Sequence, residues 1–334
     1  MLNCSVIGLG VGEKHAEAYE SYNKTLLKSL CDINKNLQPH LNTKFPNARF
    51  HLNDELIIND NDIDIISVAS FDNFHSDQII RSLNNGKHVM AEKPLCLHKE
   101  ELIKIIEAKK NNPDTKLSSN LALRTNSRFL RMRNDIKKGL FGEVFYLEGD
   151  YYWGRKEKLF GWRADMEFYS IIHGAAIHMI DLAMWLLDDK PIKIQAMANS
   201  IPTKNTNLNF NSFVIILLEF QNGTIVKLTG NGGCVHPHFH GIKIFGNELT
   251  CIHNLQEAYY LDSADSNSSP VEILEPYPEK DSRKNLIHSF VNHILDDSNL
   301  PIVSEKDVYD VMSVCFAAEE AVKKGEKIDV NYYK

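Results

Sequence analysis

The amino-acid sequence predicts two domains of different class. Residues 1–121 are expected to form a Rossmann-type, doubly wound α/β domain with a parallel sheet, and residues 122–334 an α+β domain with an open, mostly antiparallel sheet covered by helices. The length of 334 residues is too great for one ordinary core. Short apolar runs alternate with amphipathic stretches in the first part, whereas longer apolar runs with fewer helices between them dominate the second.

The first part contains five short apolar runs that are typical of buried parallel strands: CSVIGL, LLKSLCD, IDIISVAS, KHVMAEK and KLSSNLA. Between them, KHAEAYESYNK, HSDQIIRSLNNG and KEELIKIIEAKKNN carry apolar residues at intervals of three and four. That spacing indicates helices that pack by one face. Right-handed crossovers between the strands then give a doubly wound sheet.

The second part contains longer strand-like runs: EVFYLEGDYYW, KIQAMANSI, SFVIILLEFQNGTIVKLTGNG, FHGIKIFGNELTCIHN and EAYYLD. The Asn222-Gly223 pair inside one of them is a strong hairpin signal. Three helices are expected to cover one face of this sheet: IHMIDLAMWLLD, RKNLIHSFVNHILDD and EKDVYDVMSVCFAAEEAVKKG. The polar run DSADSNSSP is expected to be a surface loop.

The amino-acid composition limits the classes of partner that we expect for this protein. The 44 acidic residues outnumber the 37 Lys and Arg residues, for a formal net charge of −7, which disfavours nucleic-acid binding. The six cysteines show no zinc-knuckle or disulfide spacing, so we expect reduced, buried thiols. No stretch reaches the ~18 apolar residues of a membrane span, and the sequence runs directly into a strand without a leader pattern. We therefore expect a cytoplasmic protein with no metal, membrane or nucleic-acid partner.

A glycine-rich turn predicts a dinucleotide site. Gly8, Gly10 and Gly12, with Val11 among them, lie in the first strand-to-helix turn, where backbone amides can approach a pyrophosphate at a helix N-terminus. Asp32 ends the second predicted strand, where its carboxylate can accept hydrogen bonds from the adenosine ribose. Its charge would repel a 2'-phosphate, so NAD is favoured over NADP. A tight turn without function is the alternative.

The chain resembles the glucose-fructose oxidoreductase, inositol dehydrogenase and rhizopine catabolism (Gfo/Idh/MocA) family over nearly its whole length. The resemblance rests on the glycine turn followed by His15, on ASFDNFHSDQIIRSLNNGKHVMAEKPL with its specific EKP, and on GWRADMEFYSIIHGAAIHMIDLAMWLLDD. It implies the fold described above and a second domain that supports homo-oligomers, dimers or tetramers, through its sheet. The cofactor contacts that it implies are Gly8, Gly10, Gly12, Asp32, Ser70, Asn73, His75, Glu92, Lys93 and Asn120, with Trp162 and Arg163 reaching the cofactor or substrate from the second domain.

The sequence departs from the family pattern at two points. The glycine turn has one residue fewer before its His than is usual. The family's catalytic Asp stands four residues before the His of the second domain, but position 174 is Gly here. The adjacent His173 is a candidate to substitute for it and to contact the substrate. These departures weaken any assignment to inositol or glucose as the substrate.

Two residues are predicted to act on the reacting oxygen. Oxidation of a secondary alcohol requires a group that accepts the hydroxyl proton while hydride leaves carbon. His178 is the expected acid/base, because an imidazole titrates near neutral pH, and Asp181 on the same helix face is expected to orient it or bind a substrate hydroxyl. Lys93, held extended before Pro94, is expected to stabilise the developing alkoxide. The alternative is that Lys93 is itself the base.

Further candidates come from the second domain. Four side chains are expected to line a polyhydroxylated or anionic substrate, with ordinary packing as the alternative: Tyr151, Tyr152, Arg155 and Arg163. His236, His238 and His240 stand at alternate positions and would share one face if this run is a strand. Zinc binding, polar contacts in the substrate cleft or at an interface, and plain strand surface are the readings that the sequence leaves open.

The leading functional hypothesis is reversible oxidation of a ring hydroxyl on a sugar, cyclitol or sugar nucleotide, with NAD as the hydride acceptor. An NAD-assisted glycoside hydrolase of the same fold and a dinucleotide sensor without catalysis are the alternatives. Release of NADH during turnover separates a dehydrogenase from the hydrolase, and a sensor would have no need of Lys93 or His178.

Overall fold

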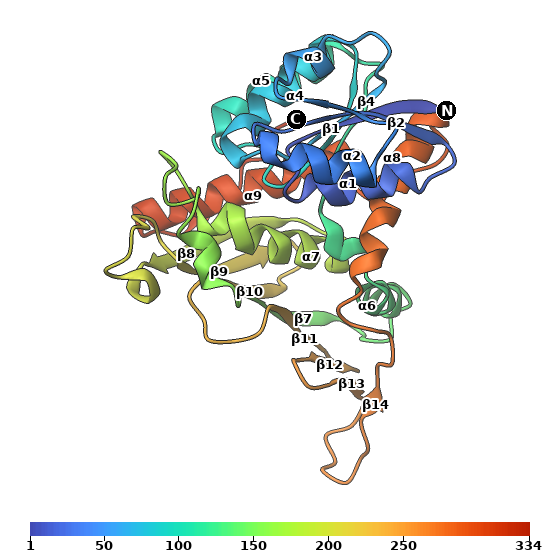
Figure 1. Ribbon diagram of the computed structural model, residues 1–334. Helices are drawn as coiled ribbons and strands as arrows, with labels where there is room; N and C mark the ends of the chain where they lie inside the picture. The colour runs from blue at the N-terminus through green and yellow to red at the C-terminus, as the bar shows by residue number, and fades with distance from the viewer. The chain divides into compact units, whose positions relative to one another are not determined.

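A computed structural model describes all 334 residues as two compact units, each drawn in Figure 1. The first unit comprises Met1–Thr125, Lys280–Tyr309 and Tyr333–Lys334. The second comprises Asn126–Glu279 and Asp310–Tyr332. The predicted second domain was continuous, whereas the structure assigns a stretch near the C-terminus to the first unit.

The first unit is built on a six-stranded sheet in the order β3-β2-β1-β4-β5-β6. All neighbouring strands are parallel, so the predicted doubly wound sheet is confirmed. The order reverses between β1 and β4, and ligands of such sheets bind beyond the carboxyl ends of the strands at that point. The strands are β1 (Leu2–Ile7), β2 (Thr25–Cys31), β3 (Arg49–His51), β4 (Ile65–Val68), β5 (His88–Ala91) and β6 (Leu117–Ser119).

Helices cover this sheet. They are α1 (Gly12–Glu20), α2 (Gln38–Lys44), α3 (Glu55–Ile58), α4 (His75–Asn84), α5 (Lys99–Asn111) and α8 (Lys284–Leu295), with single turns at η1 (Lys35–Leu37), η2 (Asp72–Phe74), η3 (Ala122–Thr125) and η7 (Lys280–Arg283). The α4 helix shows why they form, because Gln78, Ile79, Ser82 and Leu83 recur at intervals of three and four and are buried.

The position of α8 corrects a prediction. We expected this helix on the sheet of the second domain, but it packs against α1 of the first unit (Figure 1). The rings of Tyr22 and His288 stack with centroids 4.1 Å apart, and His288 Nε2 lies 3.0 Å from the carbonyl oxygen of Ala18. The apolar spacing of a helix shows that one face is buried, but not which surface buries it.

The second unit contains a nine-stranded sheet in the order β14-β13-β12-β11-β7-β10-β9-β8-β15. Every neighbouring pair is antiparallel except β7 and β10. The Asn222-Gly223 pair joins β9 to the antiparallel β10, so the predicted hairpin is confirmed. The strands are β7 (Val144–Tyr152), β8 (Pro191–Asn199), β9 (Phe213–Phe220), β10 (Ile225–Asn231), β11 (Phe239–Gly246), β12 (Thr250–His253), β13 (Ala258–Leu261), β14 (Val271–Glu272) and β15 (Ile328–Asp329).

Helix α7 (Ile177–Leu187) packs on one face of this sheet and is almost wholly buried. Gly149 of β7 makes room for it, because a Cβ there would lie 3.0 Å from Met179 Cε and 2.8 Å from Leu228 Cδ2. The other helical segments are α6 (Ser127–Lys137), η4 (Lys156–Leu159), the π-helix η5 (Ile172–Ala176), η6 (Ile201–Thr203) and α9 (Glu305–Lys324). The boundary between the units falls within α9.

The opposite face of this sheet is partly apolar and exposed. Met197 of β8, Leu217 of β9 and Ile225 of β10 are 64%, 41% and 41% exposed. Strand pairing places all three on one face. The association of copies through this sheet stays a prediction. None of the helices combines the length and apolar character needed to cross a membrane.

Candidate functional site

The glycine turn between β1 and α1 has three glycines with distinct roles. Gly8 has φ +84°, and a Cβ there would lie 2.4 Å from the backbone of Ala69, which follows β4. Gly12 begins α1, and its Cβ would lie 2.9 Å from Val6 Cγ1. Gly10 has no heavy atom within 4 Å of its Cβ position. Gly8 and Gly12 therefore allow close packing of the turn and helix on the sheet, and Gly10 leaves the turn open to a ligand.

This turn fits a dinucleotide. Val11, the N-cap of α1, makes no side-chain hydrogen bond to the helix, which leaves the first amides without a side-chain cap. The Asp32 carboxylate accepts hydrogen bonds from the backbone amides of Leu9 (2.7 Å) and Asn34 (2.8 Å). Its negative charge is therefore fixed beside the turn. The assignment of Asp32 to the ribose hydroxyls stays a prediction.

A buried polar network lies at the carboxyl ends of β4, β5 and β6. His15 Nδ1 lies 3.1 Å from Ser67 Oγ, and His15 Nε2 lies 3.1 Å from Glu92 Oε1. Asn120 Nδ2 donates to the same Glu92 oxygen at 2.5 Å. Burial alone would raise the pKa of Glu92, but the hydrogen bond and charge of His15, followed by the hydrogen bond from Asn120, hold it at about 2. Glu92 and Asn120, both predicted cofactor contacts, are thus ordered by each other.

The other predicted contacts of the first unit have different surroundings. His75 is fully buried, and its ring nitrogens face the carbonyl oxygens of Pro94 (2.7 Å) and Ser70 (3.1 Å). A buried ring that contacts two carbonyls holds two loops together, and the predicted contact of His75 with the cofactor stays a prediction. Asn73 is exposed, and Ser70 Oγ donates to Gln78 Oε1 at 2.6 Å. Lys93 is half-buried directly after Glu92, whose Oε2 accepts a hydrogen bond from its amide at 3.3 Å.

In the second unit, four side chains form a cluster that we call the histidine wall: Tyr151, His178, His238 and His240. The rings of Tyr151 and His178 stack with centroids 5.5 Å apart and planes 7° apart. His240 and His238 meet Tyr151 edge-on at 4.8 and 5.3 Å, and His240 lies 6.0 Å from His178. The predicted His178 and Tyr151 are thus brought together, whereas Asp181, three residues along α7, is 1% exposed.

The three alternating histidines do not share a strand. Only His240 lies in β11, and the segment of His236 and His238 precedes it. His236 stacks on Tyr152 at 4.3 Å, while His240 Nδ1 contacts the hydroxyl of Tyr277. The structure contains no group of three or more His, Cys, Asp or Glu side chains that could hold a metal ion. The condition for one shared face, that the whole run is a strand, is therefore not met, and Pro237 lies where strand pairing is interrupted.

A buried cluster surrounds the position where the family Asp is missing. A Cβ on Gly174 would lie 2.3 Å from the hydroxyl oxygen of Tyr169, so that ring fills the space of a side chain at 174. The neighbouring His173 is 1% exposed, and its Nδ1 lies 3.8 Å from Glu319 Oε1 of α9. Ser170 Oγ donates to the same carboxylate and accepts from the Ile172 amide at 3.0 Å. The sequence pattern did not single out Ser170 or Glu319, because α9 lies about 150 residues further along the chain.

Replacement of Glu319 tests the electrostatics of this cluster. Burial raises the pKa of Glu319 to about 7, against the hydrogen bond from Ser170, which lowers it. The folded protein therefore binds a proton that the unfolded chain releases near pH 4.5, and this stability is lost as pH rises through about 7. We expect Glu319→Gln to be more stable than the parent at pH 8, by on the order of 1 to 3 kcal/mol, with little difference below pH 4.5. Urea unfolding at both pH values measures this, with the exposed Glu326→Gln as control. Equal parent and variant stabilities at pH 8 would contradict it.

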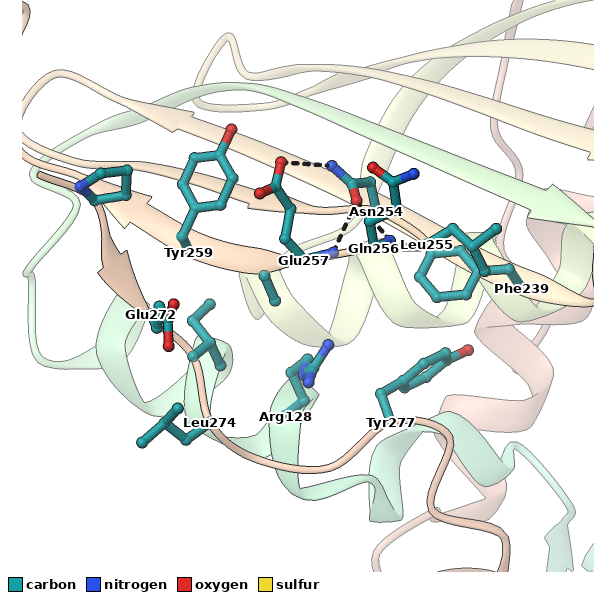
Figure 2. A pocket seen from close by; sticks show the side chains of 13 residues that line it. Arg128, Phe239, Asn254, Leu255, Gln256, Glu257, Tyr259, Glu272, Leu274 and Tyr277 are labelled. Atoms are coloured by element: carbon teal, nitrogen blue, oxygen red, sulfur yellow. Dashed lines mark hydrogen bonds between the residues drawn. The ribbon is translucent and has the colours of Figure 1, made fainter. Parts of the chain in front are cut away.

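A separate cavity of about 470 Å³ lies between the β12–β13 hairpin and β14 (Figure 2). Arg128 lines it and donates two hydrogen bonds to the carbonyl of Glu275 at 2.8 and 2.6 Å. The ring of Tyr277 lies 5.9 Å from the Arg128 guanidinium (Figure 2), and its hydroxyl contacts His240. None of the predicted catalytic residues lines this cavity. Because Tyr277 lines this cavity and its hydroxyl contacts His240, it connects the cavity to the histidine wall.

Comparison with known proteins identifies the family. Residues 2–120 match a family described as "Oxidoreductase family, NAD-binding Rossmann fold", and residues 129–251 match the "GFO/IDH/MocA C-terminal domain". The inositol 2-dehydrogenase/D-chiro-inositol 3-dehydrogenase of Shouchella clausii is 25% identical over 246 residues, 73% of this chain and 69% of its own. An alpha-N-acetylgalactosaminidase of Shewanella oneidensis is 27% identical over 175 residues, 46% of this chain and 38% of its own.

Solved structures agree on the fold. Levoglucosan dehydrogenase, in complex with NADH and L-sorbose, aligns with a TM-score of 0.86 at 19% identity over 99% of both chains. The two matched domains, the parallel sheet with its glycine turn and the mostly antiparallel second sheet together show that this chain belongs to the GFO/IDH/MocA family and is an NAD-binding oxidoreductase.

Proposed function

We propose that the protein is an NAD-dependent dehydrogenase that reversibly oxidises a secondary ring hydroxyl of a sugar, cyclitol or sugar nucleotide. The observation that carries the proposal is the histidine wall, in which Tyr151 fixes the His178 ring by stacking at 5.5 Å. Such a wall offers imidazole groups for hydroxyls and an aromatic face for the ring carbons. The relatives named for inositol and levoglucosan support the same class of substrate.

The proton of the reacting hydroxyl passes to His178. A neutral imidazole accepts it in the oxidation and returns it in the reduction. Tyr151 restrains the orientation of this ring, and a fixed orientation lowers the entropic cost of reaching the reactive geometry. Asp181, buried on the same helix, acts as a positioning residue for His178 or as a ligand for a neighbouring hydroxyl.

Lys93 donates a hydrogen bond from its ammonium to the same oxygen and stabilises the negative charge that develops there. A bound NAD supplies the ring that accepts the hydride from carbon. The residues proposed to hold it are Gly8, Gly10, Val11, Gly12, Asp32, Ser70, Asn73, Glu92, Asn120 and Trp162. Glu92 carries its charge at neutral pH, since its pKa is about 2, and its carboxylate lies next to Lys93 in the chain.

A hydrolase that uses NAD within one turnover is the second candidate. It is favoured by one observation, the similarity to the alpha-N-acetylgalactosaminidase of Shewanella oneidensis over 46% of this chain. Such an enzyme oxidises and re-reduces the sugar before releasing it, so that no NADH accumulates. Cleavage of nitrophenyl glycosides without net NADH would establish this function in place of the first.

NADH formation tests the proposal directly. A panel of sugars, cyclitols and sugar nucleotides with NAD is expected to give a rise in NADH absorbance for at least one member, with lower kcat/KM for NADP. For that substrate, we expect His178→Asn to lower kcat about a hundredfold to ten-thousandfold, since general acid–base catalysis is lost, and to leave NADH binding unchanged. The exposed His40→Asn is the matched control. Normal turnover by His178→Asn would exclude the assigned role.

A further inference from the structure

We propose that the substrate carries an anionic group, a carboxylate or a phosphate, and that Arg155 and Arg163 bind it beside the histidine wall. The inference rests on the proposed function and adds the charge of the substrate to it. The guanidinium groups of Arg155 and Arg163 have no carboxylate partner within the protein.

Arg155 and Arg163 differ from the other buried or part-buried arginines of the chain. Arg128 forms no ion pair either, but its Nε and Nη2 donate hydrogen bonds to the Glu275 carbonyl, and the others have carboxylate partners. Four of these form ion pairs: Arg81 with Asp54, Arg124 with Asp307, Arg131 with Asp135 and Arg133 with Asp188. No carboxylate lies within ion-pair distance of Arg155 or Arg163, and the Nε atom of each is buried without a hydrogen-bond partner. Acidic side chains are in excess, 44 against 37 Lys and Arg. Since unpaired part-buried charge is unfavourable, the missing anion is expected from a ligand.

Arg163 is held in place by two indole rings. Its guanidinium carbon lies 4.1 Å from the Trp162 ring centroid and 5.4 Å from that of Trp153. Trp153 in turn lies 5.9 Å from Tyr151, the centre of the histidine wall. Its Nη1 donates one hydrogen bond, to the Lys158 carbonyl at 3.1 Å. Cation–π contacts orient the guanidinium without neutralising it, so its charge remains available to an anion bound beside Trp153.

Arg155 is anchored to the same wall through its backbone. Gly154 has φ +60°, and a Cβ there would lie 2.4 Å from the His236 oxygen and the His238 nitrogen. The indole of Trp153 donates to the Arg155 carbonyl at 2.8 Å. The turn that carries Arg155 is therefore pressed against the segment that supplies His238 to the wall.

The chemistry of the guanidinium selects the ligand class. Its planar fork matches the two oxygens of a carboxylate or phosphate, whereas a neutral hydroxyl accepts hydrogen bonds without balancing the charge. Sugar acids, sugar phosphates and the diphosphate of a sugar nucleotide all satisfy the site. The pyrophosphate of NAD has the same chemistry, so the test must separate a substrate anion from the cofactor.

Calorimetric titration of the NADH-loaded protein makes this separation. The probes are glucuronate, glucose 6-phosphate and UDP-glucose, with myo-inositol as the neutral comparison. At least one anionic probe should bind more tightly than myo-inositol. Arg155→Gln and Arg163→Gln should each weaken that probe about tenfold to a hundredfold, through loss of a charge-assisted hydrogen bond, with myo-inositol and NADH affinities unchanged. The exposed Arg283→Gln is the control and should change neither.

The inference would be overturned by tightest binding of myo-inositol, by no binding of any anionic probe, or by unchanged probe affinity in both variants. A loss of NADH affinity alone in Arg163→Gln would assign the anion to the cofactor and also overturn it. Because titration needs no turnover, its outcome is independent of the proposed function. Tight binding of an anionic probe without NADH formation from any substrate would support the anion site and contradict the proposed dehydrogenase activity.

Discussion

Lys93→Ala is expected to lower kcat about a hundredfold to a thousandfold on the substrate that gives the most NADH. The magnitude is that of removing one donor from a developing oxyanion. Lys93 is half-buried after β5, between the buried Glu92 and Pro94. The shortened side chain leaves the oxygen without its cation, whereas the glycine turn that binds the dinucleotide is untouched. NADH affinity, measured by fluorescence titration, should stay within about threefold.

A second replacement separates the two roles left open for this lysine. Lys93→Arg keeps a cation that donates hydrogen bonds but cannot release a proton near neutral pH. Electrostatic stabilisation predicts a smaller loss of kcat in Lys93→Arg than in Lys93→Ala, and a role as the base predicts equal losses. Lys99→Ala, an exposed lysine at the start of α5, is the control. Near-normal turnover by Lys93→Ala would refute both roles.

Gly8→Ala and Gly10→Ala are expected to impair different properties. The first should lower thermal stability, and the second should weaken NADH binding. At Gly8, alanine must adopt φ +84° with its Cβ 2.4 Å from the Ala69 backbone. The positive φ costs about 1 to 2 kcal/mol, and displacement of the backbone that follows β4 raises the total to about 3 kcal/mol or more. Tm should fall by roughly 6 to 12 °C, at 2 to 4 °C per kcal/mol for a domain of this size. At Gly10, where no atom lies within 4 Å, Tm should not change.

NADH binding gives the complementary result. A methyl group at Gly10 occupies the space through which the pyrophosphate approaches the backbone, so we expect NADH affinity to fall by about tenfold or more. Thermal unfolding without ligand and NADH titration of the same samples measure both effects. Normal NADH affinity in Gly10→Ala would show that the dinucleotide does not pass over this residue.

Local pattern was enough to predict much of the fold. The run from β1 through the glycine turn to α1, and the hairpin at Asn222-Gly223, follow from residues within a few positions of each other. Helix α6 was not predicted. The short strands β3, β14 and β15 were not predicted either, because they have too few residues to show a period of two. The docking of α8 on α1 needed the tertiary structure, since its apolar face fits any complementary surface.

Some residues of the site were predicted from the sequence, whereas their contacts depend on the tertiary structure. His178 and Tyr151 were predicted from the sequence, but the contacts of His238 and His240 with them depend on β11 pairing with β7. Tyr169 fills the space beside Gly174, and Glu319 joins Ser170 from another helix. No spacing in the chain reveals these contacts, because they join segments that are brought together only when the sheet and its helices pack.

By itself, the sequence determined the class of each domain, the glycine turn and the residue types available for hydride chemistry, because these depend on periodicity and on the conformational needs of single residues. Only the tertiary structure decided which side chains are already engaged, as with His75, and which charges lack a partner, as with Arg155 and Arg163. Whether a side chain has hydrogen-bond or ion-pair partners depends on which residues lie next to it in the folded protein. Burial then sets how unfavourable a polar group without a partner is.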